Sequence, residues 1–399
     1  MRDEITYLLS AKAVRERTKK IYDLSLSGKT NFEIHEEKLP EVCDFVLEVI
    51  KDNYPTLEIP FHSRWGHFQV GNIDRNSKLD EKIKDLDPLE RARIKLDLVI
   101  TSVLLDAGAG PTWSFDEEGT SFNRSEGLGV ASWHMFMSGA FSNDGGLRAD
   151  SEKLMKLNSS DIEKGFQVSG SNPLVGVEGR AGLQASLGKC VSSKPSAFKD
   201  ARPGNILDYM ISKHGKEFAA TDLLEAVLLN FGDIWPSRIT VDGVSLGDVW
   251  NHPALGEKDD LNSLVAFHKL SQWLTYSLIE PFVEAGCTVH SVNKMTGLAE
   301  YRNGGLLLDS GLVTLRDPSM SSVAHKPDSE IIIEWRALTV TLLDKMADII
   351  RGKLGFSEDE FPLAKVLEGG TWWAGRRLAK EKREDSSPPL KLDSDGTVF

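Results

Sequence analysis

The sequence predicts a mainly α-helical protein with a minor β component. Long segments carry apolar residues at the spacing of a helix face, the clearest being 89–111, 265–286 and 330–355. The clearest strand pattern is at 237–249, where apolar and polar residues alternate about an Asp-Gly pair, as in a β-hairpin. Helices should therefore far outnumber strands.

The same periodicity predicts the individual elements in chain order. Segment 89–111 begins charged, becomes almost wholly apolar and should stop at its glycines and proline. Residues 112–128 are rich in turn formers and suit a short hairpin at Glu118-Gly119. The remaining helices are expected at 5–26, 38–53, 178–192, 222–235, 265–286 and 330–355.

The chain shows few linker-like segments and no internal repeat. We therefore expect one compact domain over residues 1–380. Residues 381–399 turn polar and contain prolines, which predicts a C-terminal tail packed on the surface.

Composition excludes several classes of function. The chain has 399 residues and a formal net charge of −13, which disfavours nucleic acid and anionic membranes as partners. Its three cysteines are far apart without CxxC spacing, which argues against disulfides and a thiolate metal site. The sequence shows no secretory signal and no run of about 20 apolar residues, so we expect a cytoplasmic protein.

Standard catalytic motifs are absent: the sequence has no phosphate-binding glycine loop, no HExxH and no GxSxG. The glycines at 108–110 are better explained as a helix stop than as a phosphate loop. His62 and His67 are five residues apart, a poor match for ligands on one helix face. We expect no metal and no cofactor.

The stretch FHSRWGHF at 61–68 gathers two histidines, an arginine and three aromatic residues. His62, Arg64 and Trp65 could grip a phosphate and stack on a flat ligand. An equally weighted alternative is a loop packed on the core with its polar tips in water.

Lys269 and Gln272 lie three residues apart in an apolar helix pattern, and so share one helix face. A lysine in such surroundings either reaches water or meets an acid. Glu300 and Glu334 are the candidate acids.

The stretch AEYR places Glu300, Tyr301 and Arg302 at the entry of a buried helix pattern. A site for a polar small molecule would gather such groups, since active sites collect charge in apolar surroundings. The alternative is a cluster with a purely structural role, in which Arg302 binds backbone carbonyls. Glu334 and Arg336 are better interpreted as a structural ion pair. EGGTWWAGRR at 368–377 suits a close-packed wall, and its spacing implies no chemistry.

Several of these stretches together resemble the uracil-catabolism protein family of fungi and bacteria. They are FHSRWGHF, SVLLDAGAGP, FHKLSQWLTYSLIEP, AEYRNGGLLLDSG, EWRALTV, LEGGTW and SDGTVF, spread from about residue 8 to the end. The resemblance implies a pathway that opens uracil at the nucleoside or nucleotide level and recovers its nitrogen through urea.

The order NPLVGVEGR, IWPSR, FHKLSQ, AEYR, IEWRA is similar, more distantly, to the queuosine-salvage nucleotide N-glycosidases. That resemblance implies a helical, DNA-glycosylase-like architecture. It places Lys269 on the site lysine of that family and Glu300 on its catalytic acid position, where an aspartate is usual. The added methylene moves the carboxylate by about one bond length.

We therefore expect an N-ribosyl hydrolase that releases urea from ribosylurea or its 5′-phosphate, with Glu300 and Lys269 as catalytic residues. The substrate would be a ring-opened pyrimidine nucleoside or nucleotide, and enzymes of the pathway are possible partners. An amidohydrolase and a non-catalytic scaffold protein are the alternatives. The expected substrate-binding residues are His62, Arg64, Trp65, Arg238, Gln272, Tyr301 and Arg302.

Overall fold

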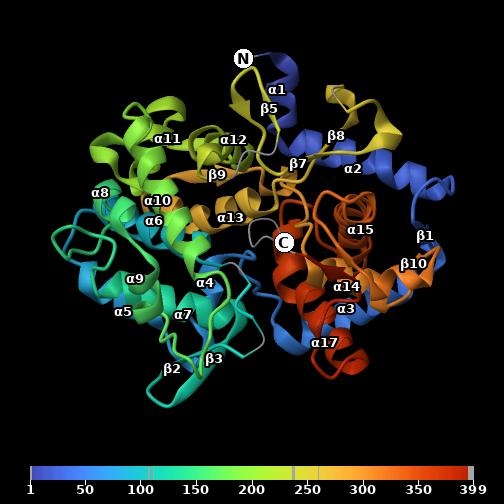
Figure 1. Ribbon diagram of the computed structural model, residues 1–399, viewed down its shortest axis with the longest axis horizontal. Helices are drawn as coiled ribbons and strands as arrows, with labels where there is room; N and C mark the ends of the chain where they lie inside the picture. The colour runs from blue at the N-terminus through green and yellow to red at the C-terminus, as the bar shows by residue number, and fades with distance from the viewer. Residues whose placement is uncertain (1, 107, 111, 236–238, 259, 394–399) are drawn as a thin grey trace. The chain divides into compact units, whose positions relative to one another are not determined.

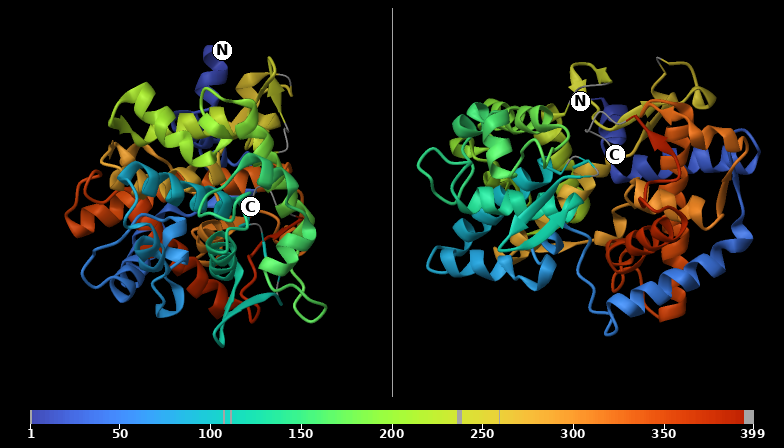
Figure 2. Two further views of the ribbon diagram at one scale, coloured as in Figure 1. Left: turned by 90° about the vertical axis from the view of Figure 1, so that its left-hand side faces the viewer. Right: turned by 60° about the horizontal axis from the view of Figure 1, so that its bottom comes forward.

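A computed structural model describes residues 2–106, 108–110, 112–235, 239–258 and 260–393. These residues are mainly helical, and their strands are two to four residues long (Figure 1). Each sheet of the described chain pairs only two strands. Figure 2 shows short strands beside the helices in two further views. The prediction of a mainly α protein with a minor β component is confirmed.

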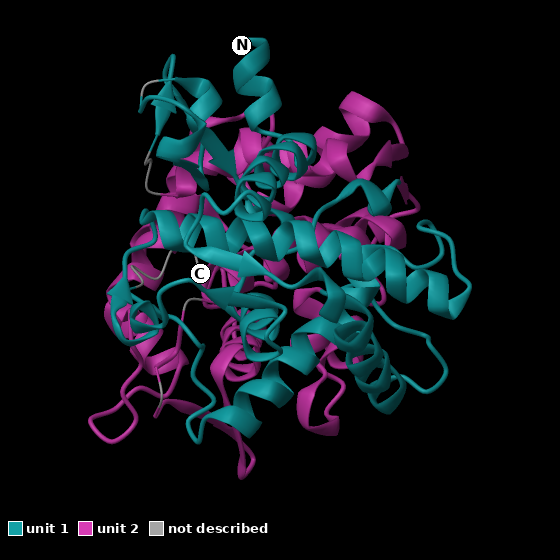
Figure 3. Ribbon diagram, turned by 90° about the vertical axis from the view of Figure 1, so that its right-hand side faces the viewer, with its two compact units in different colours: residues 1–62, 237–272, 291–399 teal, residues 63–236, 273–290 magenta. Residues whose placement is uncertain are grey.

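Contacts divide the chain into two compact units (Figure 3). Unit 1 is built from Met1–His62, Ser237–Gln272 and Ser291–Phe399, and unit 2 from Ser63–Pro236 and Trp273–His290. This division reflects where contacts between residues are densest. The expectation of one compact domain over residues 1–380 stays a prediction.

Unit 1 combines segments from both ends of the chain. Its helices are α1 (Asp3–Leu8), α2 (Ala11–Leu26), α3 (Leu39–Asn53), α14 (Tyr301–Asp309), α15 (Glu330–Leu354), α16 (Leu363–Val366) and α17 (Trp372–Lys382). Its strands are β1 (Phe32–Ile34), β5 (Thr240–Val241), β6 (Val244–Ser245), β7 (Val249–Asn251), β8 (Leu264–Ala266), β10 (Val313–Leu315), β11 (Ala324–His325) and β12 (Lys391–Leu392).

Unit 2 is also mainly helical. Its helices are α4 (Arg64–His67), α5 (Arg75–Ile83), α6 (Pro88–Leu104), α7 (Arg124–Met137), α8 (Ser151–Lys156), α9 (Ser159–Gly165), α10 (Val177–Ser193), α11 (Ile206–His214) and α12 (Ala220–Phe231). Its strands are β2 (Ser114–Glu117), β3 (Thr120–Asn123), β4 (Glu217–Ala219) and β9 (Thr288–His290). The boundary at residue 272 falls within α13 (Lys269–Glu284).

The predicted hairpin at 237–249 is present in its described part. Strands β5 and β6 pair antiparallel, with Val241 opposite Val244. Asp242 and Gly243 between them both have positive φ, 49° and 77°, as a two-residue type I′ turn requires. Residues 237 and 238 lie outside the described part. The second predicted hairpin also forms, with Glu118-Gly119 between β2 and β3.

Two helix predictions are wrong in part: segment 5–26 forms two helices, α1 and α2, and segment 265–286 is not helical at its start. Residues 265–286 do not form a continuous helix, because Leu264–Ala266 form β8, which pairs antiparallel with β7. His268 has φ of 50° and turns the chain from the strand into α13. Apolar periodicity does not distinguish a short buried strand from the first turn of a buried helix.

Helix α14 is packed closely against two neighbours, α15 and α17 (Figure 1). A Cβ built on Gly304 would lie 2.8 Å from the Trp335 ring of α15, and one on Gly375 of α17 would lie 2.1 Å from the carbonyl oxygen of Arg302. Only glycine permits this approach of backbones. The first turn of α14 is therefore held in a fixed position.

The described part of the polar tail packs on unit 1. Strand β12 pairs parallel with β11, and Leu390 is fully buried. Arg383 forms an ion pair with Asp309 at the end of α14. No helix of the described residues is long and apolar enough to cross a membrane.

Candidate functional site

Glu300 is the N-cap of α14. Its backbone is extended, and its carboxylate accepts hydrogen bonds from the amides of Arg302 at 2.7 Å and Asn303 at 2.5 Å, one to each oxygen. The residue is only 7% exposed. The positive end of the helix dipole and the two amides therefore stabilise a buried negative charge at this point.

The ionisation of Glu300 is set by opposing influences. Burial raises the pKa of this carboxyl, whereas the two amide hydrogen bonds and the charges of Lys269 and His62 act to lower it, and the net pKa is raised. Glu300, Lys269 and His62 all belong to unit 1. A carboxylate of this kind can exchange a proton closer to neutral pH than an exposed glutamate can.

Lys269 occupies the first position of α13 and is held there through its backbone. Its amide donates to Oδ2 of Asp248 at 3.0 Å. The preceding His268 is buried in a left-handed conformation, and its Nε2 contacts the carbonyl of Leu8 at 2.7 Å. Non-glycine residues adopt this conformation at a cost, and such strain gathers at functional sites.

An ion pair connects the segments of Lys269 and Glu300. Arg336 of α15 donates to both carboxylate oxygens of Asp248, at 2.8 and 2.7 Å. Its Nε also donates to the carbonyl of Ala299, the residue before Glu300, at 3.4 Å. One guanidinium thus links the carboxylate that caps α13 to the chain that enters α14.

Asp248 is held firmly in its ionised form. Burial alone would raise the pKa of this carboxyl, but the charge and hydrogen bonds of Arg336, with donors from Trp250 and Lys269, lower it to about 2. Arg336 of EWRA therefore forms a structural ion pair, with Asp248 as its partner, whereas Glu334 contacts His252 and Asn31.

Gln272 links the same two segments. Its Oε1 accepts from the amide of Thr296 at 3.0 Å, and its Nε2 donates to the carbonyl of Phe267 at 3.1 Å. Gln272 is fully buried. These contacts give the residue a structural role, and the substrate contact expected for it stays a prediction.

A second pair of interacting side chains in unit 1 consists of His62 and Glu368. The imidazole Nδ1 lies 2.7 Å from Oε2 of Glu368, and the hydroxyl of Tyr54 donates to Oε1 at 3.2 Å. Glu368 lies in a π-helical turn, Leu367–Thr371, between α16 and α17. Sequence reasoning missed Glu368, although π-helical turns are frequent at functional sites and paired glycines marked the close packing here.

Arg302 makes the kind of contact expected of a purely structural residue. Its Nη1 donates to the carbonyl of Ser386 at 2.9 Å, and its guanidinium lies 4.8 Å from the centre of the Tyr301 ring. The residue is 6% exposed. The expected roles of Tyr301 and Arg302 in substrate binding stay predictions.

Arg64 and Trp65 belong to unit 2 and are engaged in its interior. Arg64 is fully buried, pairs with Asp106 at 3.1 Å and donates to Ser102 Oγ at 2.7 Å. The indole of Trp65 donates to the carbonyl of Ser277 at 2.8 Å. Arg238 lies outside the described residues.

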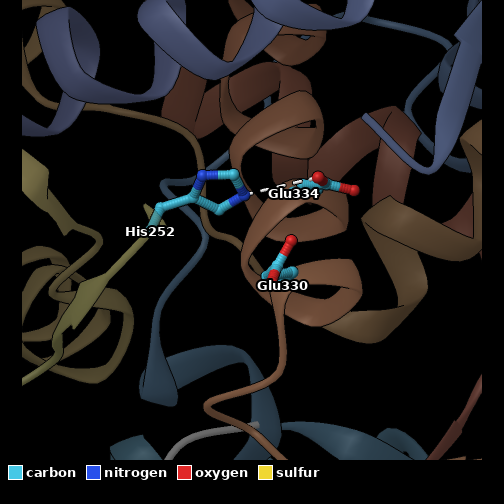
Figure 4. Close-up of side chains that lie close together, drawn as sticks. All are labelled: His252, Glu330 and Glu334. Carbon is cyan, nitrogen blue, oxygen red and sulfur yellow. Dashed lines mark hydrogen bonds and ion pairs between the residues drawn. The ribbon is translucent and has the colours of Figure 1, made fainter. Parts of the chain in front are cut away.

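One group within the described chain could hold a cation: His252, Glu330 and Glu334, whose ligand atoms lie within 4.8 Å of one another (Figure 4). His252 Nε2 lies 3.3 Å from Oε1 of Glu334, while Oε2 of Glu334 accepts two hydrogen bonds from Asn31. Direct hydrogen bonds account for Glu334 and for Nε2 of His252, whereas Nδ1 of His252 is buried without a hydrogen-bond partner in the described part of the chain. Glu330 is exposed. The expectation that no metal takes part stays a prediction.

A family model matches residues 7–399, and its description is "Protein of unknown function (DUF1688)". The chain belongs to the DUF1688 family. The resemblance to the uracil-catabolism protein family is confirmed by two full-length relatives.

The first relative is Uracil catabolism protein 4 of Lachancea kluyveri, which is 39% identical over 99% of this chain and 99% of its own length. The second is Protein urg3 of Schizosaccharomyces pombe, which is 40% identical over 100% of this chain and 99% of its own length. The similarity therefore includes both units and the segments that carry Lys269 and Glu300.

Proposed function

We propose that this protein acts in uracil catabolism as an N-ribosyl hydrolase that releases urea from ribosylurea or ribosylurea 5′-phosphate. The name of a full-length relative supports the pathway. The observation that supports the reaction is the buried carboxylate of Glu300, fixed by two amides and influenced by the charge of Lys269.

The chemistry of an N-ribosyl bond suits such a carboxylate. Breaking the bond between C1′ and nitrogen builds positive charge on the sugar, and a fixed negative charge near C1′ stabilises it. The same carboxylate can accept a proton from the attacking water. A glutamate whose pKa is raised by burial serves as a base better than an ordinary one does, since its conjugate acid is weaker.

Lys269 keeps Glu300 ionised in this proposal. Its positive charge lowers the pKa of the carboxyl against the effect of burial. The strained backbone of His268 and the hydrogen bond from the Lys269 amide to Asp248 fix where this charge lies. Within unit 1, Arg302 remains a candidate to bind a 5′-phosphate, with Tyr301 beside it.

An amidohydrolase with a cysteine nucleophile is disfavoured by the described thiols. Cys43, Cys190 and Cys287 are all buried, and burial raises the pKa of Cys43 to about 12 and of Cys190 to about 11. The thiolate is the nucleophile, so these side chains are inert near neutral pH. A scaffold protein without activity is the remaining alternative.

The decisive experiment is an assay of urea release. Purified protein is incubated with ribosylurea and, separately, with its 5′-phosphate, and both free urea and the free sugar are measured, with and without EDTA. We expect equal amounts of urea and sugar from at least one substrate, and unchanged rates with EDTA. Tight binding of the substrate without turnover would favour the scaffold. Loss of activity on chelation, restored by zinc or magnesium, would contradict a metal-free reaction.

A further inference from the structure

The pair of His62 and Glu368 has the geometry of an oriented acid–base group. The side chain of His62 is only 9% exposed, and its Nδ1 lies 2.7 Å from the Glu368 carboxylate. An ionised carboxylate only accepts, so Nδ1–H donates to Glu368. Exchange of a proton with a substrate would then take place at Nε2.

Several contacts fix this imidazole in place. The amide of His62 donates to the carbonyl of Ala364 at 3.2 Å, and the Trp372 ring lies 6.0 Å from the imidazole between ring centres. Glu368 is itself held at its other oxygen by Tyr54. Because His62 is held through its backbone and Glu368 through its second oxygen, the pair keeps one orientation while a proton moves.

The pair lies close to the N-terminus of α14. The π-helical turn that carries Glu368 contacts α14, and Gly375 of α17 packs directly on the backbone of Arg302. His62 also contributes to the electrostatic environment of the Glu300 carboxyl. The imidazole and the carboxylate proposed to act on C1′ therefore belong to one neighbourhood within unit 1.

We propose that His62 is the general acid that protonates the leaving urea, with Glu368 as the residue that orients it. This inference rests on the proposed function. As the bond from C1′ to nitrogen breaks, its electron pair goes to the nitrogen, which takes the proton from Nε2 of the imidazolium. Water forms the new bond to C1′ and gives its proton to Glu300. The products are ribose, or its 5-phosphate, and neutral urea.

The division of labour follows from the leaving group. An unprotonated urea nitrogen leaves poorly, so proton donation should matter greatly, and general acids typically contribute about 10²–10⁴-fold. Glu300 cannot supply that proton while it accepts one from water. Lys269 serves a different purpose, because its charge, after the two backbone amides, lowers the pKa of Glu300 against the effect of burial.

The test compares two leaving groups on the same sugar. Ribosylurea needs protonation, whereas p-nitrophenyl β-D-ribofuranoside has a leaving group stable as an anion. We expect His62→Gln to lower kcat on ribosylurea by at least about 10²-fold and on the nitrophenyl riboside by less than about 10-fold. Glu300→Gln should lower both strongly. Where a 5′-phosphate is required, the phosphorylated forms of both substrates are used.

Two further variants keep the test decisive. Glu368→Gln preserves shape and should show the same selective loss to a smaller degree, and it replaces His62→Gln if that variant fails to fold. His35→Gln, another histidine of unit 1, is the matched control and should behave as wild type on both substrates.

Equal losses on the two substrates in both the His62 and the Glu368 variant would overturn the acid assignment while leaving the hydrolase intact. A wild-type protein that cleaves neither substrate would instead refute the proposed function, and the assignment of His62 with it.

Discussion

Asp248, which is half-buried, and Glu300, which is buried, are two carboxylates of unit 1 with opposite electrostatic environments. Asp248 receives both arms of a guanidinium, and its pKa falls to about 2. Glu300 receives two backbone amides, and its pKa is raised because burial outweighs the amides and the neighbouring charges. Both side chains are held in place, but they differ in what balances their charge.

The comparison separates a positioning carboxylate from a reactive one. A guanidinium within hydrogen-bonding distance fixes Asp248 as an anion at every physiological pH, which suits a residue that anchors the start of α13. Backbone amides fix the position of Glu300 but leave its protonation sensitive to its neighbours, which suits a base.

The largest expected effect comes from Glu300→Gln. The change keeps the shape of the side chain but removes the charge that stabilises the developing cation at C1′. Turnover should fall by roughly 10²–10³-fold, corresponding to about 3–4 kcal/mol. The rate of urea release under saturating substrate measures this. Substrate affinity and melting temperature should change far less, and near wild-type turnover would show that Glu300 is not catalytic.

Asp248→Asn should act on stability instead. Leaving Arg336 buried without its partner should cost roughly 3 kcal/mol of unfolding free energy near pH 7. The pKa of Asp248 is lowered from 3.8 to about 2, so the wild type should lose roughly 2 kcal/mol as pH falls from about 4 to about 2. The Asp248→Asn variant should not show this loss of unfolding free energy at low pH. Urea denaturation at several pH values measures both effects, and parallel curves for the two proteins would contradict the assignment.

Lys269→Met should alter the pH dependence of catalysis. Lys269 lowers the pKa of Glu300, so its loss should raise that pKa further. The fraction of ionised Glu300 then falls at the acidic end, and the acid limb of kcat/KM should move to higher pH, with roughly 10-fold lower activity there. A pH–rate profile measures the shift. Lys345→Met, at an exposed ion pair with Glu36, is the control. An acid limb that stays in place would separate Lys269 from Glu300.

The smallest expected effect concerns Arg302→Lys. If Arg302 binds the 5′-phosphate, losing its bidentate fork should weaken ribosylurea 5′-phosphate several-fold and ribosylurea hardly at all. Comparing KM for the two substrates measures this preference. Equal changes in KM for the two substrates, together with a lower melting temperature, would show that the role of Arg302 is limited to its contact with Ser386.

The helices and the hairpin were predictable because their signals are local. Periodicity predicts α10, α15 and the turn at Asp242-Gly243 to within two residues or less. Strand β8 was missed because its identity depends on β7, fifteen residues earlier, which no local pattern reveals. The same reason explains why the two-stranded sheets between distant segments were not expected.

The candidate site was predictable only in part for a similar reason. Charged residues in apolar stretches pointed to Lys269, Glu300 and the ion pair of Arg336. Their partners could not be identified, since no local pattern shows that Asp248 lies beside Arg336 or Glu368 beside His62. An acid becomes notable only when folding places it beside a guanidinium or an imidazole.

The π-helical turn at Leu367–Thr371 resets the rotational phase of the helix that follows it. The amide of Trp372 bonds to the carbonyl of Leu367, five residues back, so this turn holds one residue more than an α-turn. Each residue advances a helix by about 100°. Deleting Gly369 would therefore rotate α17 by about that angle, turning Gly375 away from Arg302 or Glu368 away from His62. The length of this one turn determines whether α17 can contact α14 while Glu368 faces His62.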